Sequence, residues 1–127
     1  MEQIKKDPFS IFVCATHYEG DPPDNAVEFS KNFVKSEEKF NLSSVKYAIY
    51  SLGDLTYKYF GKFGKDVDEA LERNGAQRIM PNRIGTDHMS AIEEDFNEWK
   101  KDIWPKMIPY LEKLEKIYVI IYILNIC

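Results

Sequence analysis

Two stretches of the chain decide its fold: Ile11-Phe-Val-Cys-Ala-Thr-His-Tyr-Glu-Gly-Asp-Pro-Pro-Asp-Asn-Ala26 and Tyr47-Ala-Ile-Tyr-Ser-Leu-Gly-Asp-Leu-Thr-Tyr-Lys-Tyr-Phe60. Each runs from a short apolar segment, typical of a strand buried on both faces, into a loop rich in glycine, acidic and aromatic residues. In open α/β sheets, the loops at the carboxyl ends of parallel strands bind flat ligands. The sequence therefore predicts two parallel strands, over 10–15 and 46–51, with a ligand site at their loops.

Helical patterns separate the predicted strands. The first helix follows Asp24 or Asn25, either of which can cap it. The second begins near residue 59, turns its apolar side to the core and ends at Asn74-Gly75. The core-facing residues are Ala26, Phe29, Phe33 and Val34 in the first, and Phe60 or Phe63, Val67, Ala70 and Leu71 in the second. A third strand is expected over 77–80, followed by a loop over 81–88. Alternating strands and helices favour a parallel sheet with right-handed crossovers.

The last predicted helix starts at a capping-box pattern formed by Ser90 and Glu93. Its core-facing side carries Ile92, Phe96, Trp99, Ile103 and Met107. Pro105 should bend it. Trp104 points to a different side and fits either packing or a partner contact. The acidic run at its start, Glu93, Glu94 and Asp95, fits helix capping and solubility, or the steering of a positively charged partner.

Composition excludes several classes of function. The chain has 127 residues, and 17 basic against 21 acidic side chains give a net charge of -4. It therefore lacks the basic field that nucleic acids or anionic lipids require. The two cysteines, Cys14 in a strand and Cys127, form neither a metal motif nor a disulfide framework, and His17 and His88 have no nucleophile or metal-ligand spacing. No signal run precedes the first strand, so a reducing, cytoplasmic setting is expected.

The two loops resemble those that hold the flavin in the FMN-binding domain of NADPH-dependent diflavin reductases, the cytochrome P-450 reductase family. Gly75-Ala-Gln-Arg-Ile79 and Ile92-Glu-Glu-Asp-Phe-Asn-Glu-Trp99 resemble that domain's last strand and helix, in the same order. The resemblance covers residues 10–107. It implies an α/β, flavodoxin-like three-layer sandwich with a parallel sheet.

The resemblance also implies which residues would hold FMN. An isoalloxazine ring is a large apolar plane with a polar edge, so its site needs aromatic faces and backbone donors. Tyr57 occupies the position of the tyrosine that stacks on the flavin ring in this family, and Gly53 would let the backbone approach the ring. The full candidate set is Thr16, His17, Tyr18, Leu52, Gly53, Asp54, Tyr57, Tyr59, Phe60, Thr86 and Asp87. Read without the resemblance, Leu-Gly-Asp is an ordinary strand-to-loop turn and Tyr57 half-buries against the next helix.

Several departures from the family pattern fall on this set, among them Tyr18 in place of a flexible glycine and Tyr59 in place of a histidine. His17 replaces the second stacking aromatic, where an imidazole either stacks or lies in solvent, and a protonated one would favour reduced anionic flavin. Asp54 replaces an amide, and its carboxylate would oppose negative charge on the flavin. Thr86 or Asp87 would have to meet the pyrimidine edge, since the third loop lacks the family's acidic run.

Nothing ahead of Ser10 resembles the family's first strand and phosphate loop. The expected division is therefore an extension over 1–9, a partial flavodoxin-like domain over 10–116 and an apolar tail over 117–127. Without a phosphate loop, FMN binding should be weak or absent in this chain alone. The edge beside Ser10 would be open. The segment 117–124 is too short to span a membrane; it is either translated non-coding sequence or a parallel strand that covers this edge.

The leading hypothesis is a fragment of a diflavin reductase that relays electrons from FAD and NADPH to a haem protein. FAD and NADPH would bind only in the full-length family, and the partners would be a haem-protein acceptor and the FAD/NADPH domain. The location would be the cytoplasm, or the cytosolic face of the endoplasmic reticulum in a full-length reductase. One alternative is a flavin-free remnant or protein-interaction module. A phosphate-accepting signalling domain is the third, but the acid cluster that it needs is absent from the end of the first strand.

Overall fold

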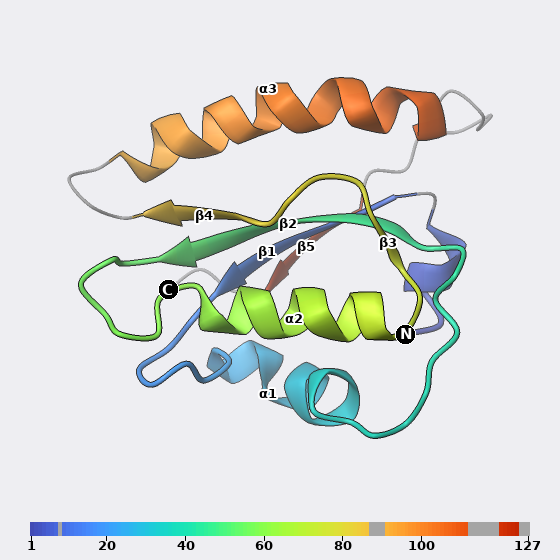
Figure 1. Cartoon of the computed structure of the whole chain (residues 1–127), viewed down its shortest axis with the longest axis horizontal. Helices are drawn as coiled ribbons and strands as arrows, with labels where there is room; N and C mark the ends of the chain where they lie inside the picture. The colour runs from blue at the N-terminus through green and yellow to red at the C-terminus, as the bar shows by residue number, and fades with distance from the viewer. Residues whose placement is uncertain (8, 87–90, 112–119, 125–127) are drawn as a thin grey trace.

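The computed structural model describes residues 1–7, 9–86, 91–111 and 120–124, with only the backbone for Thr86 and for 120–124. Its centre is a parallel sheet in the order β3-β2-β1-β5 (Figure 1). A further strand, β4, pairs with the last residues of β2, whereas β3 pairs with the first residues of β2. The strands are β1 (Ser10–Ala15), β2 (Lys46–Gly53), β3 (Gln77–Arg78), β4 (Arg83–Thr86) and β5 (Ile120–Leu124). The predicted α/β fold with a parallel sheet is confirmed.

Helices cover both faces of the sheet. One face carries α2 (Lys62–Arg73) beside the consecutive pieces η2 (Asp24–Ala26), α1 (Val27–Phe29) and η3 (Ser30–Val34), and the opposite face carries α3 (Ile92–Leu111) (Figure 1). A further short helix, η1 (Ile4–Lys6), precedes β1. None of the helices described combines the length and the hydrophobicity needed to cross a membrane.

The two faces of the sheet build two hydrophobic clusters, because successive side chains of a strand point to opposite sides. Phe12 of β1 and Tyr47 of β2 belong to the cluster under α2. Ile11 and Tyr50 belong to the cluster under α3 together with Trp99, which is 1% exposed. Both central strands are thus buried on both faces, as their apolar sequence predicts.

Three predicted elements are wrong in detail. The loop expected over 81–88 contains β4, because Arg83–Thr86 pairs with the last residues of β2. The second helix begins at Lys62 instead of near 59, since Gly61 takes the left-handed conformation with φ +67° and separates it from the preceding turn. The segment 24–34 is a 3-10 turn, a short α-helix and a π-helix, and no side chain of Asp24 or Asn25 caps it.

The tail and the last helix follow the sequence expectations more closely. Ile120–Leu124 pairs in parallel with Ser10–Cys14, on the side of β1 opposite β2, which confirms the strand predicted within 117–124. Trp99, Ile103 and Met107 are buried, as predicted. The helix α3 continues through Pro105 to Leu111. Ser90, half of the predicted capping box, lies outside the described residues.

Candidate functional site

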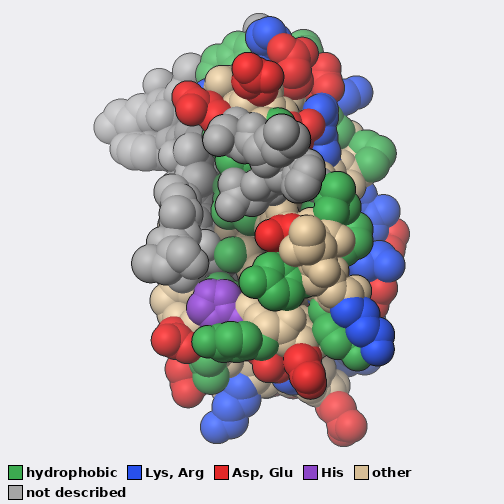
Figure 2. Space-filling view, turned by 90° about the vertical axis from the view of Figure 1, so that its left-hand side faces the viewer, with side chains coloured by type: hydrophobic (Ala, Val, Ile, Leu, Met, Phe, Trp, Pro, Cys, Tyr) green, Lys and Arg blue, Asp and Glu red, His purple; other side chains and the backbone are tan. Residues whose placement is uncertain are grey.

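The loops that follow β1 and β2 meet at the carboxyl edge of the sheet and enclose a cavity of about 350 Å³. Figure 2 looks onto this end of the molecule, where hydrophobic, acidic and histidine side chains gather. The cavity is lined by Thr16, His17, Tyr18, Gly53, Asp54, Tyr57, Tyr59 and Phe60. All eight belong to the set expected from the sequence, so residues from two separate loops are brought together as the parallel pairing requires.

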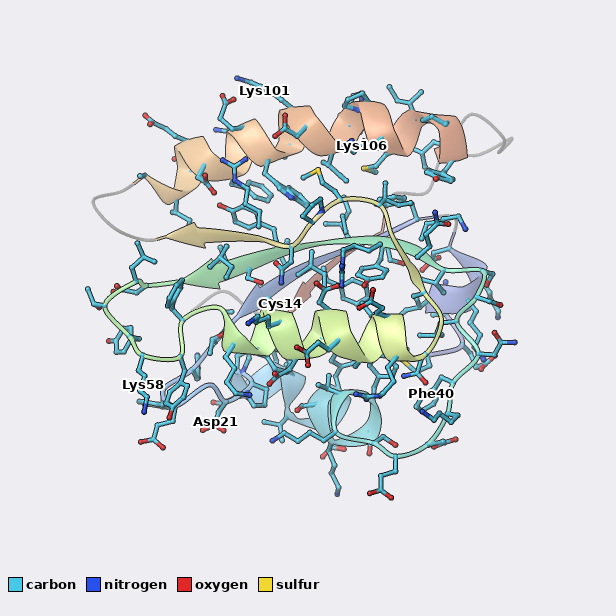
Figure 3. The ribbon with its side chains drawn as sticks, viewed as in Figure 1. Cys14, Asp21, Phe40, Lys58, Lys101 and Lys106 are labelled. Atoms are coloured by element: carbon cyan, nitrogen blue, oxygen red, sulfur yellow. The ribbon has the colours of Figure 1, made fainter. Side chains whose placement is uncertain are left out.

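The first loop is fixed by backbone hydrogen bonds. The His17 N–H donates to the Asp21 carbonyl at 2.9 Å, and the Asp21 N–H donates back to the His17 carbonyl at 2.9 Å. Asp21 thus closes this turn, on the side that leads into α1 (Figure 3). Tyr18, at its tip, has φ +39° and is 86% exposed, and its ring meets the His17 imidazole edge-on at 5.9 Å. The turn therefore holds His17 half-buried at the cavity and presents Tyr18 to solvent.

Thr16 joins the first loop to helix α2. Its hydroxyl oxygen accepts a hydrogen bond from the Phe63 N–H at 3.0 Å. The first N–H groups of a helix have no partner within the helix, so this bond satisfies one of them. Thr16 thus couples the position of the cavity wall to the start of α2.

The second loop folds around Asp54. The Asp54 carboxylate accepts hydrogen bonds from the Thr56 N–H at 2.8 Å and from the Thr56 hydroxyl at 2.7 Å. Tyr57 follows with its ring 61% exposed at the cavity rim. The Lys58 ammonium lies 5.0 Å from the centre of the Tyr59 ring, at the outer edge of the loop (Figure 3). The loop therefore presents two phenol rings, while the Asp54 carboxylate is engaged by its own turn.

The need for glycine at position 53 has a structural cause that the sequence did not reveal. A Cβ on Gly53 would lie 3.0 Å from the Gly61 nitrogen and 3.3 Å from the Phe60 Cβ. Both contacts are tighter than ordinary packing, so the missing side chain lets the loop 54–61 fold back onto the end of β2. Gly53 is needed for the shape of the cavity before any ligand is considered.

The remaining expected site residues lie elsewhere. Leu52 packs against the hydrophobic cluster under α3, because the alternation along β2 places it on the same face as Tyr50. The backbone of Thr86 ends β4 opposite Gly53, beside the cavity-lining loop. Asp87 and His88 lie outside the described residues.

Sequence reasoning also missed a polar network behind the site. The Tyr50 hydroxyl donates to Asp95 Oδ2 at 2.7 Å, and Arg83 Nε donates to Asp95 Oδ1 at 3.1 Å. Burial raises the pKa of Asp95, but the hydrogen bonds from Arg83 and Tyr50 outweigh it, so that the pKa lies below its usual value. Asp95, expected in a solvated acidic run, instead ties α3 to β2 and β4.

A second network repeats this arrangement on the other face of the sheet. The Tyr47 hydroxyl donates to Asp68 Oδ1 at 2.6 Å, and Arg78 Nε donates to the same oxygen at 2.8 Å. Two tyrosines three positions apart in a buried strand are the sequence signal, because a buried phenol hydroxyl requires a partner. The position of that partner cannot be read from the strand alone.

Two other kinds of chemistry would need a reactive thiol or a set of metal ligands among the described residues near this edge. Cys14 is fully buried, and burial raises the pKa of its thiol to about 12, so the thiol is inert near neutral pH. No group of three or more His, Cys, Asp or Glu side chains within the described ranges is placed to hold a metal ion. The arrangement is suited to binding a flat aromatic molecule between ring-bearing loops.

Comparisons with known proteins agree with this geometry. Residues 1–99 match the family model described as flavodoxin. The chain is 46% identical over 105 residues to NADPH–cytochrome P450 reductase of Bos taurus, covering 83% of this chain and 15% of that protein. The corresponding reductase of Dictyostelium discoideum is 35% identical over 111 residues, covering 87% of this chain and 16% of that protein. The chain thus spans only a small part of the length of these relatives.

Among solved structures, oxidised flavodoxin 1 from Bacillus cereus is similar in fold. The two structures agree with a TM-score of 0.60 at 18% sequence identity, and the match covers 85% of this chain and 69% of that chain. At this identity the likeness concerns the arrangement of the backbone.

Proposed function

The chain belongs to the flavodoxin family, and on that premise we propose that it binds FMN between the loops after β1 and β2 and serves as the FMN module of an electron-transfer reductase. The observation that carries this proposal is the cavity of about 350 Å³, lined from two loops by one imidazole, three phenol rings and one phenyl ring. Flat cofactors are held by such walls, with backbone groups at their rim.

Each residue at the cavity would have a separate role in binding FMN. Tyr57 and His17 offer ring faces from opposite loops, and Gly53 keeps the loop close to the end of β2. A protonated His17 would stabilise negative charge in the cavity, whereas the Asp54 carboxylate is held by Thr56. FMN, when bound, would supply the chemistry by taking up and releasing one or two electrons. Thr86 and Asp87 remain candidates for the polar edge of the ring.

The partners proposed for the module follow from its relatives. In a reductase, electrons would reach it from an FAD- and NADPH-binding part and leave to a haem protein, on the cytosolic side of the cell. The exposed Glu93 and Glu94 at the start of α3 would speed the encounter with a positively charged partner, and salt would weaken this effect.

Titration of the full chain with FMN tests the proposal, with quenching of flavin fluorescence as the readout. Saturable binding of low affinity is expected, because the sequence offers no phosphate loop, and Tyr57→Ala should weaken it further by about tenfold or more because a ring face is lost. The matched control is Trp104→Ala, which removes an aromatic ring that is 55% exposed on α3, away from the cavity. Equal affinity of Tyr57→Ala and the wild type would place the flavin elsewhere and contradict the proposed site.

A flavin-free interaction module is the second candidate. In its favour, two polar side chains at the cavity already bond within the protein, Thr16 to Phe63 and Asp54 to Thr56. Among the described residues, none ahead of Thr16 lines the cavity. A folded chain that shows no saturable binding of FMN or riboflavin would contradict the first candidate and favour this one.

A further inference from the structure

The size and walls of the cavity between the loops bear on which part of a flavin it can hold. Its volume of about 350 Å³ lies near the lower end of the range of about 300–1,000 Å³ that ligand pockets span. Most of its lining side chains are aromatic: His17, Tyr18, Tyr57, Tyr59 and Phe60. Such a cavity is suited to a flat ring system more than to the polar chain that carries the phosphate of FMN.

The charge that lines the cavity is negative. Among its lining residues, all of which lie in the described part of the chain, Asp54 is the one acid, and none is a lysine or an arginine. The Asp54 carboxylate is held at the cavity because it accepts hydrogen bonds from the Thr56 N–H and hydroxyl. A phosphate monoester carries a charge of about -1.5 to -2 at neutral pH, so this carboxylate would repel it.

The lysines next to the two loops are engaged outside the cavity. The Lys58 ammonium lies 5.0 Å from the centre of the Tyr59 ring (Figure 3). Lys62 begins α2, and its ammonium forms an ion pair with Asp66 at 2.5 Å, one turn further along the helix. The stem of Lys62 lies against the first loop, because a Cβ on Gly20 would overlap it. Neither lysine lines the cavity, so neither is placed to grip a phosphate inside it.

The first loop, which forms one wall of the cavity, carries further charge of the same sign. Its charged residues over 16–25 are all acidic and exposed: Glu19, Asp21 and Asp24. Charges in water interact over about 8–10 Å at moderate salt, and over longer distances at low salt. These carboxylates therefore add to the repulsion of an anionic ligand, and His17 is the one lining group that could oppose it, by taking up a proton.

We propose that this cavity recognises the isoalloxazine ring without gripping the phosphate, so that it takes riboflavin at least as tightly as FMN. The aromatic side chains of the two loops would hold the ring, and the chain that carries the phosphate would lead out into solvent. Asp54 would set the selectivity, because its carboxylate disfavours the phosphate ester and not the uncharged riboflavin. This inference rests on the proposed flavin site and adds which part of the flavin supplies the affinity.

Titration of the full chain with lumiflavin, riboflavin and FMN tests the inference, with quenching of flavin fluorescence as the readout. The dissociation constants of lumiflavin and riboflavin should agree within about threefold, because the ring supplies the binding. At low ionic strength FMN should bind about threefold more weakly than riboflavin, and the difference should disappear at about 0.3 M salt. Inorganic phosphate should compete with FMN no better than sodium chloride at equal ionic strength.

Matched substitutions separate Asp54 from the general charge of the chain. Asp54→Asn keeps an oxygen that can accept from Thr56 and removes the charge, so the ratio of FMN affinity to riboflavin affinity should rise about threefold. Asp102→Asn removes the same charge from α3, where Asp102 is 65% exposed and outside the cavity lining, and should leave that ratio unchanged. Tyr57→Ala should weaken the binding of both flavins equally, because both depend on the ring face.

The outcomes that overturn this inference differ from those that overturn the proposed function. FMN that binds more than about threefold more tightly than riboflavin, or that inorganic phosphate displaces at constant ionic strength, would overturn the inference and leave the proposed function in place. An equal ratio in Asp54→Asn and the wild type would contradict the role of this carboxylate. A folded chain that binds none of the three flavins would contradict the proposed function and the inference together.

Discussion

Asp95 illustrates how one carboxylate connects three elements, and it gives a testable pH dependence. It is 29% exposed and receives hydrogen bonds from Arg83 and Tyr50. Asp95→Asn should lower the free energy of unfolding at pH 7 by about 1–2 kcal/mol, after allowance for partial solvent screening. The pKa of Asp95 is lower in the folded state than the usual value of about 3.9, so this stabilisation is present above that value and is lost as the pH falls through the folded-state pKa. Urea unfolding at pH 7 and pH 3 should show a difference between the two proteins that shrinks in acid.

Asp102→Asn is the matched control, since Asp102 is 65% exposed and lies 3.7 Å from Arg83 Nη1. Its effect should stay within about 0.5 kcal/mol. Equal losses in the two variants, or a pH-independent difference for Asp95→Asn, would contradict the network. The sequence placed Asp95 with Glu93 and Glu94 because a run of acids at a helix start is usually solvated. The pattern of one helix cannot show that an arginine from another element will meet it.

Helix α2 packs closely on the sheet at Gly64. In an exposed helix, Gly→Ala would gain about 1 kcal/mol in helix propensity. Here a Cβ would overlap the Ser51 side chain and lie 3.5 Å from the Cys14 Cβ. Overpacking costs about 1–3 kcal/mol and should outweigh that gain, so that Gly64→Ala is destabilising in urea unfolding. The control Lys65→Ala, on the exposed side, should be nearly neutral. In a Ser51→Gly background, the penalty of Gly64→Ala should largely disappear; a penalty of the same size there would show that the clash is not its cause.

The elements that the sequence predicted well are those with one dominant signal. Strands β1 and β2 are continuous apolar runs, and the buried side of α2 follows a regular spacing from Phe63 to Leu71. The segment 24–34 has the same apolar spacing, but its backbone changes from 3-10 to α to π geometry within eleven positions. Side-chain spacing identifies the buried face without fixing the hydrogen-bond pattern beneath it. Strand β4 was missed because Ile84 is its one large apolar residue. It is a strand because its backbone pairs with the last residues of β2, and that pairing leaves no pattern in the sequence of β4 itself.

The meeting of the two loops at one cavity was predictable because topology, more than local chemistry, brings them together. Two loops far apart in sequence meet because β1 and β2 are parallel neighbours, which the buried runs before His17 and Asp54 already imply. The finer details were not predictable. Thr16 bonds to the start of α2, and Gly53 accommodates Phe60, through contacts between segments that no local pattern encodes.

The position of β5 at the edge of the sheet predicts how the molecule responds to shortening. Ser10–Cys14 pairs with Ile120–Leu124, so a chain that stops at residue 119 leaves β1 as an open edge. Hydrogen exchange should show about tenfold or greater loss of protection for the β1 amides that bond to β5, with increased aggregation. Removal of 125–127 alone is the control and should leave the protection of β1 unchanged. Because β1 ends in the loop that carries His17, the shorter chain should also bind FMN more weakly. The loss of FMN affinity should be larger when more hydrogen-exchange protection of the β1 amides is lost. A shortened chain with full protection of β1 would mean that β5 adds little to the sheet.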